Sequence, residues 1–162
     1  MNKPFAVLAL ALSLTSLGMA ADSYVVIPPT IGSEMKDGKK LDKVWLAPSV
    51  EKGLKVRKTE VVWSADDRNS TLEQELTKQL ATIQVKDGAY TLKLTVVDTS
   101  KKKFTGFGYI LGRVTVEGVI TDAGGKVVAA FQNKSKINEG MGGFDYPATV
   151  DTIMNAIQKD LL

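Results

Sequence analysis

The clearest helical pattern in the sequence lies between stretches that have the character of strands. In residues 70–88 the apolar positions recur at intervals of four, four and three residues: Leu72, Leu76, Leu80 and Ile83. Ser70 and Glu73 have the spacing of a capping box, and Gly88 follows an aspartate as a stop signal. The pattern predicts an amphipathic helix from about residue 71 to residue 85, which needs an apolar surface to cover.

Strand patterns flank this helix on both sides. Residues 43–48 form a compact apolar run ended by proline, and residues 54–63 are rich in valine. After the helix, residues 89–100 alternate between apolar and polar side chains, which predicts a half-buried strand. Its apolar face consists of Leu92, Leu94 and Val96.

The C-terminal part of the sequence predicts a hairpin, a loop and a second helix. Residues 113–136 read as two strands joined by a glycine-bearing turn at residues 122–125, and residues 138–143, "NEGMGG", predict a loop. Asp145 is a candidate helix cap with Pro147 just behind it. The helical stripe that follows consists of Val150, Ile153, Met154, Ile157 and Leu161.

This order of elements predicts an α+β fold, in which a mainly antiparallel sheet of four to six strands has two helices packed on one face. The other face of the sheet is expected to be more polar. We assign the fold to a single domain over residues 41–162, preceded by an exposed lead segment over residues 21–40.

The N-terminus has the pattern of a secretory signal peptide over residues 1–20. Lys3 precedes an apolar run, and Gly18 and Ala20 supply the small residues that precede a cleavage site. We expect cleavage near Ala20 and a periplasmic or secreted location. The site lacks the cysteine of bacterial lipoproteins, and we expect no transmembrane segment in the mature chain.

The composition excludes several chemistries. The chain has no cysteine and no histidine, so disulfides, zinc sites built from these residues, and Cys–His or Ser–His–Asp nucleophiles are all excluded. The formal net charge of +3 is too small to indicate a nucleic-acid partner. No pair of carboxylates is placed for acid–base work. We therefore expect no metal, no cofactor and no enzymatic activity.

The stretch "KKKFTGFGYILGRVTVEG", residues 101–118, is the main candidate for a binding surface. A strand rather than a helix follows its glycines, which argues against a dinucleotide-binding loop. If the stretch is one straight strand, an apolar row faces solvent and marks a contact site, flanked by basic residues. The candidate binding residues are Phe107, Tyr109 and Leu111, supported by Lys103 and Arg113. Two alternatives stay open, namely a bulge near Gly108 or Gly112 that turns the row inward, and a looped glycine segment.

The second half of the chain resembles a group of small, uncharacterised bacterial envelope proteins, many of them lipoproteins. The resemblance lies in a "GFG…G" step and a "D-x-x-G-K/E-V" turn within residues 106–132, followed by the helix within residues 148–162. "KVWLAP" and the first helix fit the same pattern. The resemblance implies a periplasmic protein–protein module without known catalysis, although the lipobox cysteine of those relatives is missing here.

These observations lead us to expect a non-enzymatic, exported interaction or assembly module of the bacterial envelope. Its partner is expected to be another envelope protein or a second copy of the chain, bound through the open sheet face or a strand edge. A peripheral membrane contact stays open. The alternative is a binder of a small apolar or envelope-derived ligand, held between the sheet and the C-terminal helix where the glycines leave space.

Overall fold

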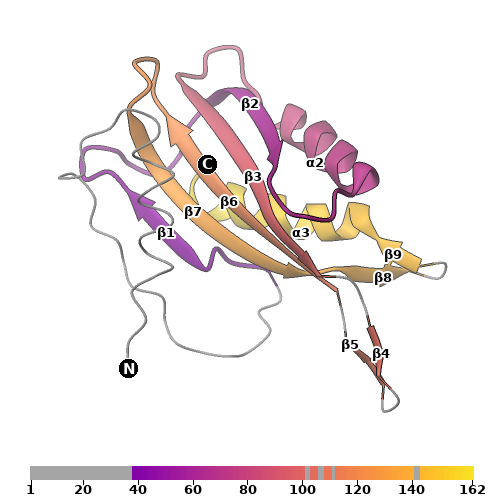
Figure 1. Cartoon of the computed structure of the whole chain (residues 1–162). Coiled ribbons are helices and arrows are strands. Elements are labelled where there is room, and N and C mark those ends of the chain that lie inside the picture. The colour runs from indigo at the N-terminus through magenta and orange to yellow at the C-terminus, as the bar shows by residue number, and fades with distance from the viewer. Residues whose placement is uncertain (1–37, 101–102, 106–107, 111, 141–142) are drawn as a thin grey trace, which may run out of the picture.

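A five-stranded sheet forms the centre of the computed structural model, which describes residues 38–100, 103–105, 108–110, 112–140 and 143–162 (Figure 1). The strand order is β1-β7-β6-β3-β2, and every neighbouring pair is antiparallel except β2 and β3. The strands are β1 (Lys43–Leu46), β2 (Val56–Trp63), β3 (Tyr90–Ser100), β6 (Arg113–Thr121) and β7 (Val127–Lys136). The predicted α+β class with a mainly antiparallel sheet is confirmed.

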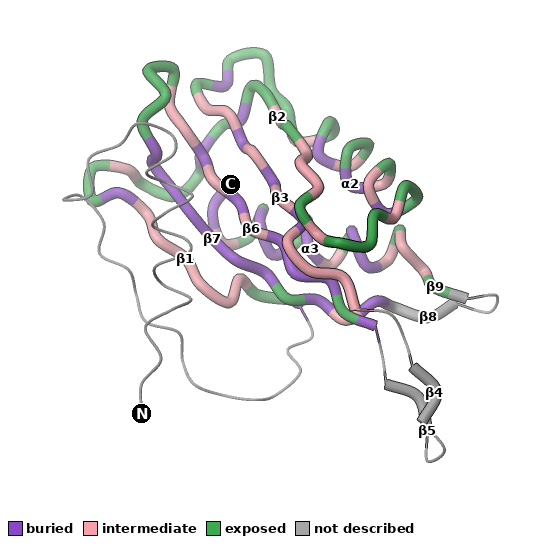
Figure 2. Tube along the Cα trace, in the orientation of Figure 1, coloured by how far each residue is buried: buried purple, intermediate pink, exposed green. Residues whose placement is uncertain are grey.

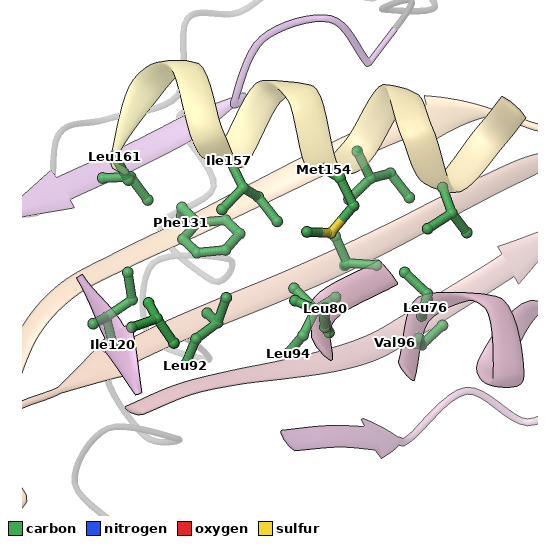
Figure 3. Close-up of a cluster of buried hydrophobic side chains, with 14 of the residues drawn as sticks. Leu76, Leu80, Leu92, Leu94, Val96, Ile120, Phe131, Met154, Ile157 and Leu161 are labelled. Atoms are coloured by element: carbon green, nitrogen blue, oxygen red, sulfur yellow. The ribbon is translucent and has the colours of Figure 1, made fainter. Parts of the chain in front are cut away.

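Both predicted helices lie on the same face of this sheet (Figures 1 and 3). Helix α2 (Ser70–Thr82) joins β2 to β3, because two parallel neighbours need a crossover connection. Helix α3 (Tyr146–Asp160) ends the chain, and the side chain of Asp145 caps it as predicted by accepting a hydrogen bond from Ala148 N at 3.0 Å.

Helix α2 begins and ends earlier than the sequence predicted. Its cap is Asn69, whose Oδ1 accepts a hydrogen bond from Leu72 N at 3.0 Å, so the capping box built on Ser70 is wrong. The helix ends at Thr82 rather than near residue 85. Gly88 has a different role from the predicted stop, because a Cβ there would lie 2.6 Å from the carbonyl carbon of Val56. It lets the chain pass closely over the start of β2.

Leucine, isoleucine and valine side chains from both helices fill the layer above the sheet (Figure 3). Leu72, Leu76 and Leu80 of α2 are fully buried, as is the predicted apolar row of β3. Along α3, the whole predicted stripe is buried. On the opposite face of β3, Thr91, Lys93 and Thr95 are partly exposed, which agrees with the expected polar face (Figure 2).

Two small hairpins form separate two-stranded sheets beside the five-stranded sheet. Strands β4 (Lys103–Thr105) and β5 (Gly108–Ile110) pair with each other, and so do β8 (Asn138–Gly140) and β9 (Gly143–Asp145). The loop predicted over residues 138–143 was therefore wrong, since Gly140 and Gly143 are cross-strand partners. Glycine weakens a strand signal in the sequence, but it does not prevent pairing once the flanking residues are in register.

The predicted signal peptide and most of the predicted lead segment lie outside the described residues. The last residues of the lead segment are held by β7, where the buried Asn133 donates through Nδ2 to the carbonyl oxygens of Gly38 at 2.8 Å and Lys40 at 3.1 Å. Among the helices of the described ranges, none is both long and apolar enough to cross a membrane.

Candidate interaction site

The pairing of β4 with β5 has the same register as the pairing of β3 with β6. Ser100 is the partner of Arg113, and three residues further along each strand Lys103 is the partner of Ile110. Figure 1 shows β4 and β5 extending away from the five-stranded sheet, of which they are not a part. Thr105 is the partner of Gly108, so the single straight strand considered for this stretch was wrong, whereas the inward bulge concerns side chains outside the described residues and stays a prediction.

The structure describes three of the five predicted binding residues, and these three lie in the hairpin or at its base. Lys103 belongs to β4, Tyr109 to β5, and Arg113 opens β6. Phe107 and Leu111 lie outside the described residues. The register makes Phe104 the direct partner of Tyr109, although a single straight strand would put these two residues on opposite faces.

Polar contacts stabilise the base of the hairpin, which is formed by the end of β3 and the start of β6 and is called its foot below. The backbone N–H of Arg113 donates to Ser100 Oγ at 3.0 Å, and its guanidinium lies 3.4 Å from the carboxylate of Asp98. Both charged side chains are about half exposed, at 49% and 48%, so this ion pair contributes little stability. Gly112 permits close packing here, because a Cβ would lie 2.8 Å from Ile137 Cδ1 and 2.9 Å from the carbonyl oxygen of Ser100.

A pocket of about 300 Å³ lies beside this foot, between the first turns of α2 and α3. The buried side chains of Leu72 and Ile137 are its apolar lining, and the rings of Phe144 and Tyr146, 6.0 Å apart, supply aromatic surface. The polar lining consists of Asp67, Arg68, Asn69, Ser70, Thr99 and Ser100. The pocket therefore combines an apolar interior with groups that form hydrogen bonds.

A hydrogen bond joins the two helix starts across the pocket. Asn69 donates through Nδ2 to the hydroxyl of Tyr146 at 2.7 Å, while its Oδ1 caps α2. One asparagine thus fixes the start of α2 and orients the ring of Tyr146.

The charge at the pocket is locally balanced. Arg68 donates two hydrogen bonds of 2.8 Å to the carboxylate of Glu73. These hydrogen bonds lower the pKa of Glu73 below its ordinary value of 4.5 and raise the pKa of Arg68. The pair offers little uncompensated positive charge to an anionic ligand.

The ligand space expected between the sheet and α3 is filled in the described structure. The ring of Phe131 occupies the position that a side chain on Gly118 would take, and Ile157 and Leu161 are buried above it. Within the described ranges there is also no cluster of three acidic side chains arranged to hold a metal ion. The pocket at the helix starts is therefore the better candidate for a contact site.

Sequence reasoning missed Asn69, Phe144 and Tyr146 as site residues. A weak signal existed, because asparagine is a preferred helix cap and two aromatics stand on either side of the capping Asp145. Their meeting, however, depends on how the starts of both helices pack against the end of β3, which no local pattern encodes.

Comparisons with known proteins give similarity at the level of fold. No protein-family profile matches the chain, and no curated protein matches it. A structure of the PelC dodecamer from Paraburkholderia phytofirmans is 14% identical, covers 72% of this chain and 95% of its own, and has a TM-score of 0.48. Lipoprotein GNA1162 from Neisseria meningitidis is 14% identical, with coverages of 64% and 99% and a TM-score of 0.32.

A minor lipoprotein from Acinetobacter baumannii is 15% identical, with coverages of 67% and 92% and a TM-score of 0.36. At these identities and TM-scores, the similarity supports no statement about the role of this chain. It says nothing of what this chain binds.

Proposed function

We propose that this chain is a non-enzymatic, exported module of the bacterial envelope that binds a protein partner through the end bearing the β4–β5 hairpin. The single observation that carries the proposal is the β4–β5 hairpin, a separate two-stranded sheet that Figure 1 shows as a ribbon beyond the five-stranded sheet. Export and the envelope location rest on the signal-peptide pattern of residues 1–20.

The composition of this ribbon supports a contact role. Its sequence brings together the apolar residues Phe104, Phe107, Tyr109, Ile110 and Leu111. A two-stranded ribbon encloses no core of its own and is marginally stable when isolated. Apolar residues concentrated there gain most by packing against another molecule.

Other surfaces of the described structure fit a protein partner less well. The edge strand β2 carries exposed Arg57, Lys58 and Glu60, and charges on an edge oppose strand addition. In the described ranges, the large apolar residues that are exposed are Val85, at 38%, and Phe144, at 36%, and Phe144 lies at the hairpin end. This end therefore has the strongest apolar character.

Site-specific photo-cross-linking tests the proposal. A photoreactive amino acid at position 109 is expected to link the protein to a partner in the intact envelope. The same amino acid at Ala123, an exposed turn residue between β6 and β7, is the control and is expected to give no such product. Equal labelling at both positions would contradict the proposal.

A double variant provides the complementary test. Phe107→Ser combined with Tyr109→Ser is expected to abolish partner capture and to leave the circular dichroism spectrum unchanged, since the hairpin lies outside the five-stranded sheet. If the well-folded double variant captures the partner as the unmodified protein does, the hairpin is not the contact site.

A further inference from the structure

We infer that the pocket between the starts of α2 and α3 binds a neutral sugar ring. The inference goes beyond the proposed function, because the residues that carry it lie outside the β4–β5 hairpin and its test needs no protein partner. Its argument comes from the size of the pocket, from the hydroxyl and amide groups that line it, and from the balance of its charges.

Aromatic and apolar side chains make up one part of the lining. The volume of about 300 Å³ is at the lower limit of sites for small molecules, so the pocket suits a single ring rather than an extended ligand. The rings of Phe144 and Tyr146 lie 6.0 Å apart, tilted by 47°, and Leu72 and Ile137 are buried beside them. The carbon–hydrogen face of a sugar ring is apolar and packs well on the electron-rich face of an aromatic ring.

Side chains that both donate and accept hydrogen bonds make up the larger part of the polar lining. Those with a hydroxyl or an amide are Asn69, Ser70, Thr99, Ser100 and Tyr146. The hydroxyls of a sugar also donate and accept, so each can form two kinds of hydrogen bond with this lining. A phosphate or carboxylate only accepts and an ammonium only donates, so neither matches the lining as well.

Three of these side chains keep hydrogen-bonding capacity for a ligand. Tyr146 Oη accepts from Asn69 Nδ2 at 2.7 Å, but within the described ranges nothing accepts the tyrosine proton, and the amide has a second N–H. The hydroxyl of Ser70 has no hydrogen-bond partner among the described residues. Neighbouring hydroxyls on a sugar ring have a spacing similar to that between Asn69 Nδ2 and Tyr146 Oη, so one ring can engage both donors.

The charges at the pocket favour a neutral ligand. Arg68 is the one basic residue among the described lining residues, and its two hydrogen bonds of 2.8 Å go to Glu73. Asp67 adds a second carboxylate to the lining region, so these three side chains together carry a net negative charge. An anionic ligand would be repelled, whereas an uncharged ring would not.

A nuclear magnetic resonance titration of the purified, isotope-labelled protein tests the inference. Glucose, galactose and mannose are the probes. At least one of them is expected to shift the backbone amide signals of Asn69, Ser100 and Phe144 in a saturable way, while the signal of Ala123, in the turn between β6 and β7, stays unchanged. The inference is overturned if none of the sugars gives saturable shifts, or if Ala123 shifts as much as the pocket residues.

Two further compounds test the class of ligand. The uronic acid of the sugar that binds most tightly has the same ring with a carboxylate, and it is expected to bind about tenfold more weakly. The compound p-cresol has an aromatic ring with one hydroxyl, and it is expected to bind more weakly than the sugar. Tighter binding of the uronic acid would make this an anion site, and tighter binding of p-cresol a site for aromatic compounds, so either result overturns the inference.

Variants connect the binding to the pocket. Phe144→Ser is expected to weaken sugar binding about tenfold, and Tyr146→Phe, which removes only the hydroxyl, about threefold. Val85→Ser is the control, because this exposed residue lies beyond the far end of α2, and unchanged binding is expected. Circular dichroism checks that each variant folds. If both folded pocket variants bind the sugar as the unmodified protein does, the pocket is not the site.

Discussion

Gly118 has no side chain, and this leaves room for an aromatic ring at the centre of the core. It is the cross-strand partner of Phe131, and the aromatic ring lies where a Cβ would stand. The ring is fully buried and contributes more apolar contact than any side chain that fits at position 118. Glycine at this position of a strand is therefore explained by packing rather than by backbone conformation.

We predict that Gly118→Ala destabilises the protein by about 1–3 kcal/mol, because the new methyl group forces the Phe131 ring out of its place. Urea denaturation measures the change. Gly124→Ala is the control, since its Cβ would meet only Asp122 Oδ1, at 3.3 Å, and we expect less than about 0.5 kcal/mol there. Equal effects at both positions would contradict this account.

The cap of α2 gives a second prediction at the scale of single residues. Asn69→Ala should lower the free energy of unfolding by about 1 kcal/mol or more, because it removes both the cap and the bond to Tyr146. Ser70→Ala should change it by less than about 0.5 kcal/mol, because Ser70 is not the cap. Thermal or chemical denaturation of the two variants distinguishes the observed cap from the predicted capping box.

The Arg68–Glu73 pair predicts a dependence on pH. The pKa of Glu73 is lowered in the folded protein from its ordinary value of 4.5, so its stabilising contribution is present above pH 4.5 and is lost as the pH falls through the folded pKa. Arg68→Gln should therefore lower the melting temperature slightly at pH 7 and have no effect well below pH 4. A constant difference across this pH range would show that the ion pair is not its cause.

At the scale of elements, β7 connects distant parts of the chain. It pairs with β6 on one side and β1 on the other, and its Asn133 also binds the backbone of residues 38–40. Asp42 adds further links, since its N–H donates to Gln132 O and its carboxylate accepts from Lys134 N. A buried polar side chain on β7 thus fixes the path by which the chain enters the sheet.

Asn133→Ala should cost about 1–3 kcal/mol, because the carbonyl oxygens of Gly38 and Lys40 lose their donor. Limited proteolysis is expected to cut faster near residues 38–42 in this variant. Lys134→Ala is the matched control, because that side chain is exposed and the bond to Asp42 comes from the backbone. Unchanged proteolysis in Asn133→Ala would argue against this role.

The main elements could be predicted because their periodicity reflects burial on one face. The leucines of α2, the stripe of α3 and the alternation of β3 all meet the same core. The small hairpins could not be predicted in this way. Gly140 and Gly143 have no side chains that could show an alternating pattern. The pairing of β4 with β5 also interrupts the alternation that a single strand over residues 104–116 would have.

At the scale of the whole molecule, the β4–β5 hairpin is separate from the folded body. We predict that replacing residues 102–111 with Asn-Gly leaves the fold intact and changes the free energy of unfolding by less than about 1 kcal/mol. The reason is that Ser100 and Arg113, which are already cross-strand partners, would then be joined by a short loop in place of the hairpin. The same variant should lose partner capture, and failure to fold would show that the hairpin is part of the core structure.

The candidate site was predictable only in part. The sequence identified the stretch around Phe107, Tyr109 and Leu111 as unusual, because aromatic residues and glycines alternate beside lysines. The pocket beside it was not predictable, since Asn69 and Tyr146 are 77 residues apart and meet only when both helices pack on the sheet. Whether the predicted residues bind a partner stays a prediction.

The pairing of β1 with β7 has a consequence for the order of folding. Strands β3, β6 and β7 are separated along the chain only by the β4–β5 hairpin and one turn, so they can pair early, whereas Val44 must wait for Phe131. Contacts between residues so far apart in sequence form late, because the intervening chain loses much conformational freedom when they close. The N-terminal strand therefore completes the sheet last, and a nascent chain stays open at this edge until nearly all of it has been made.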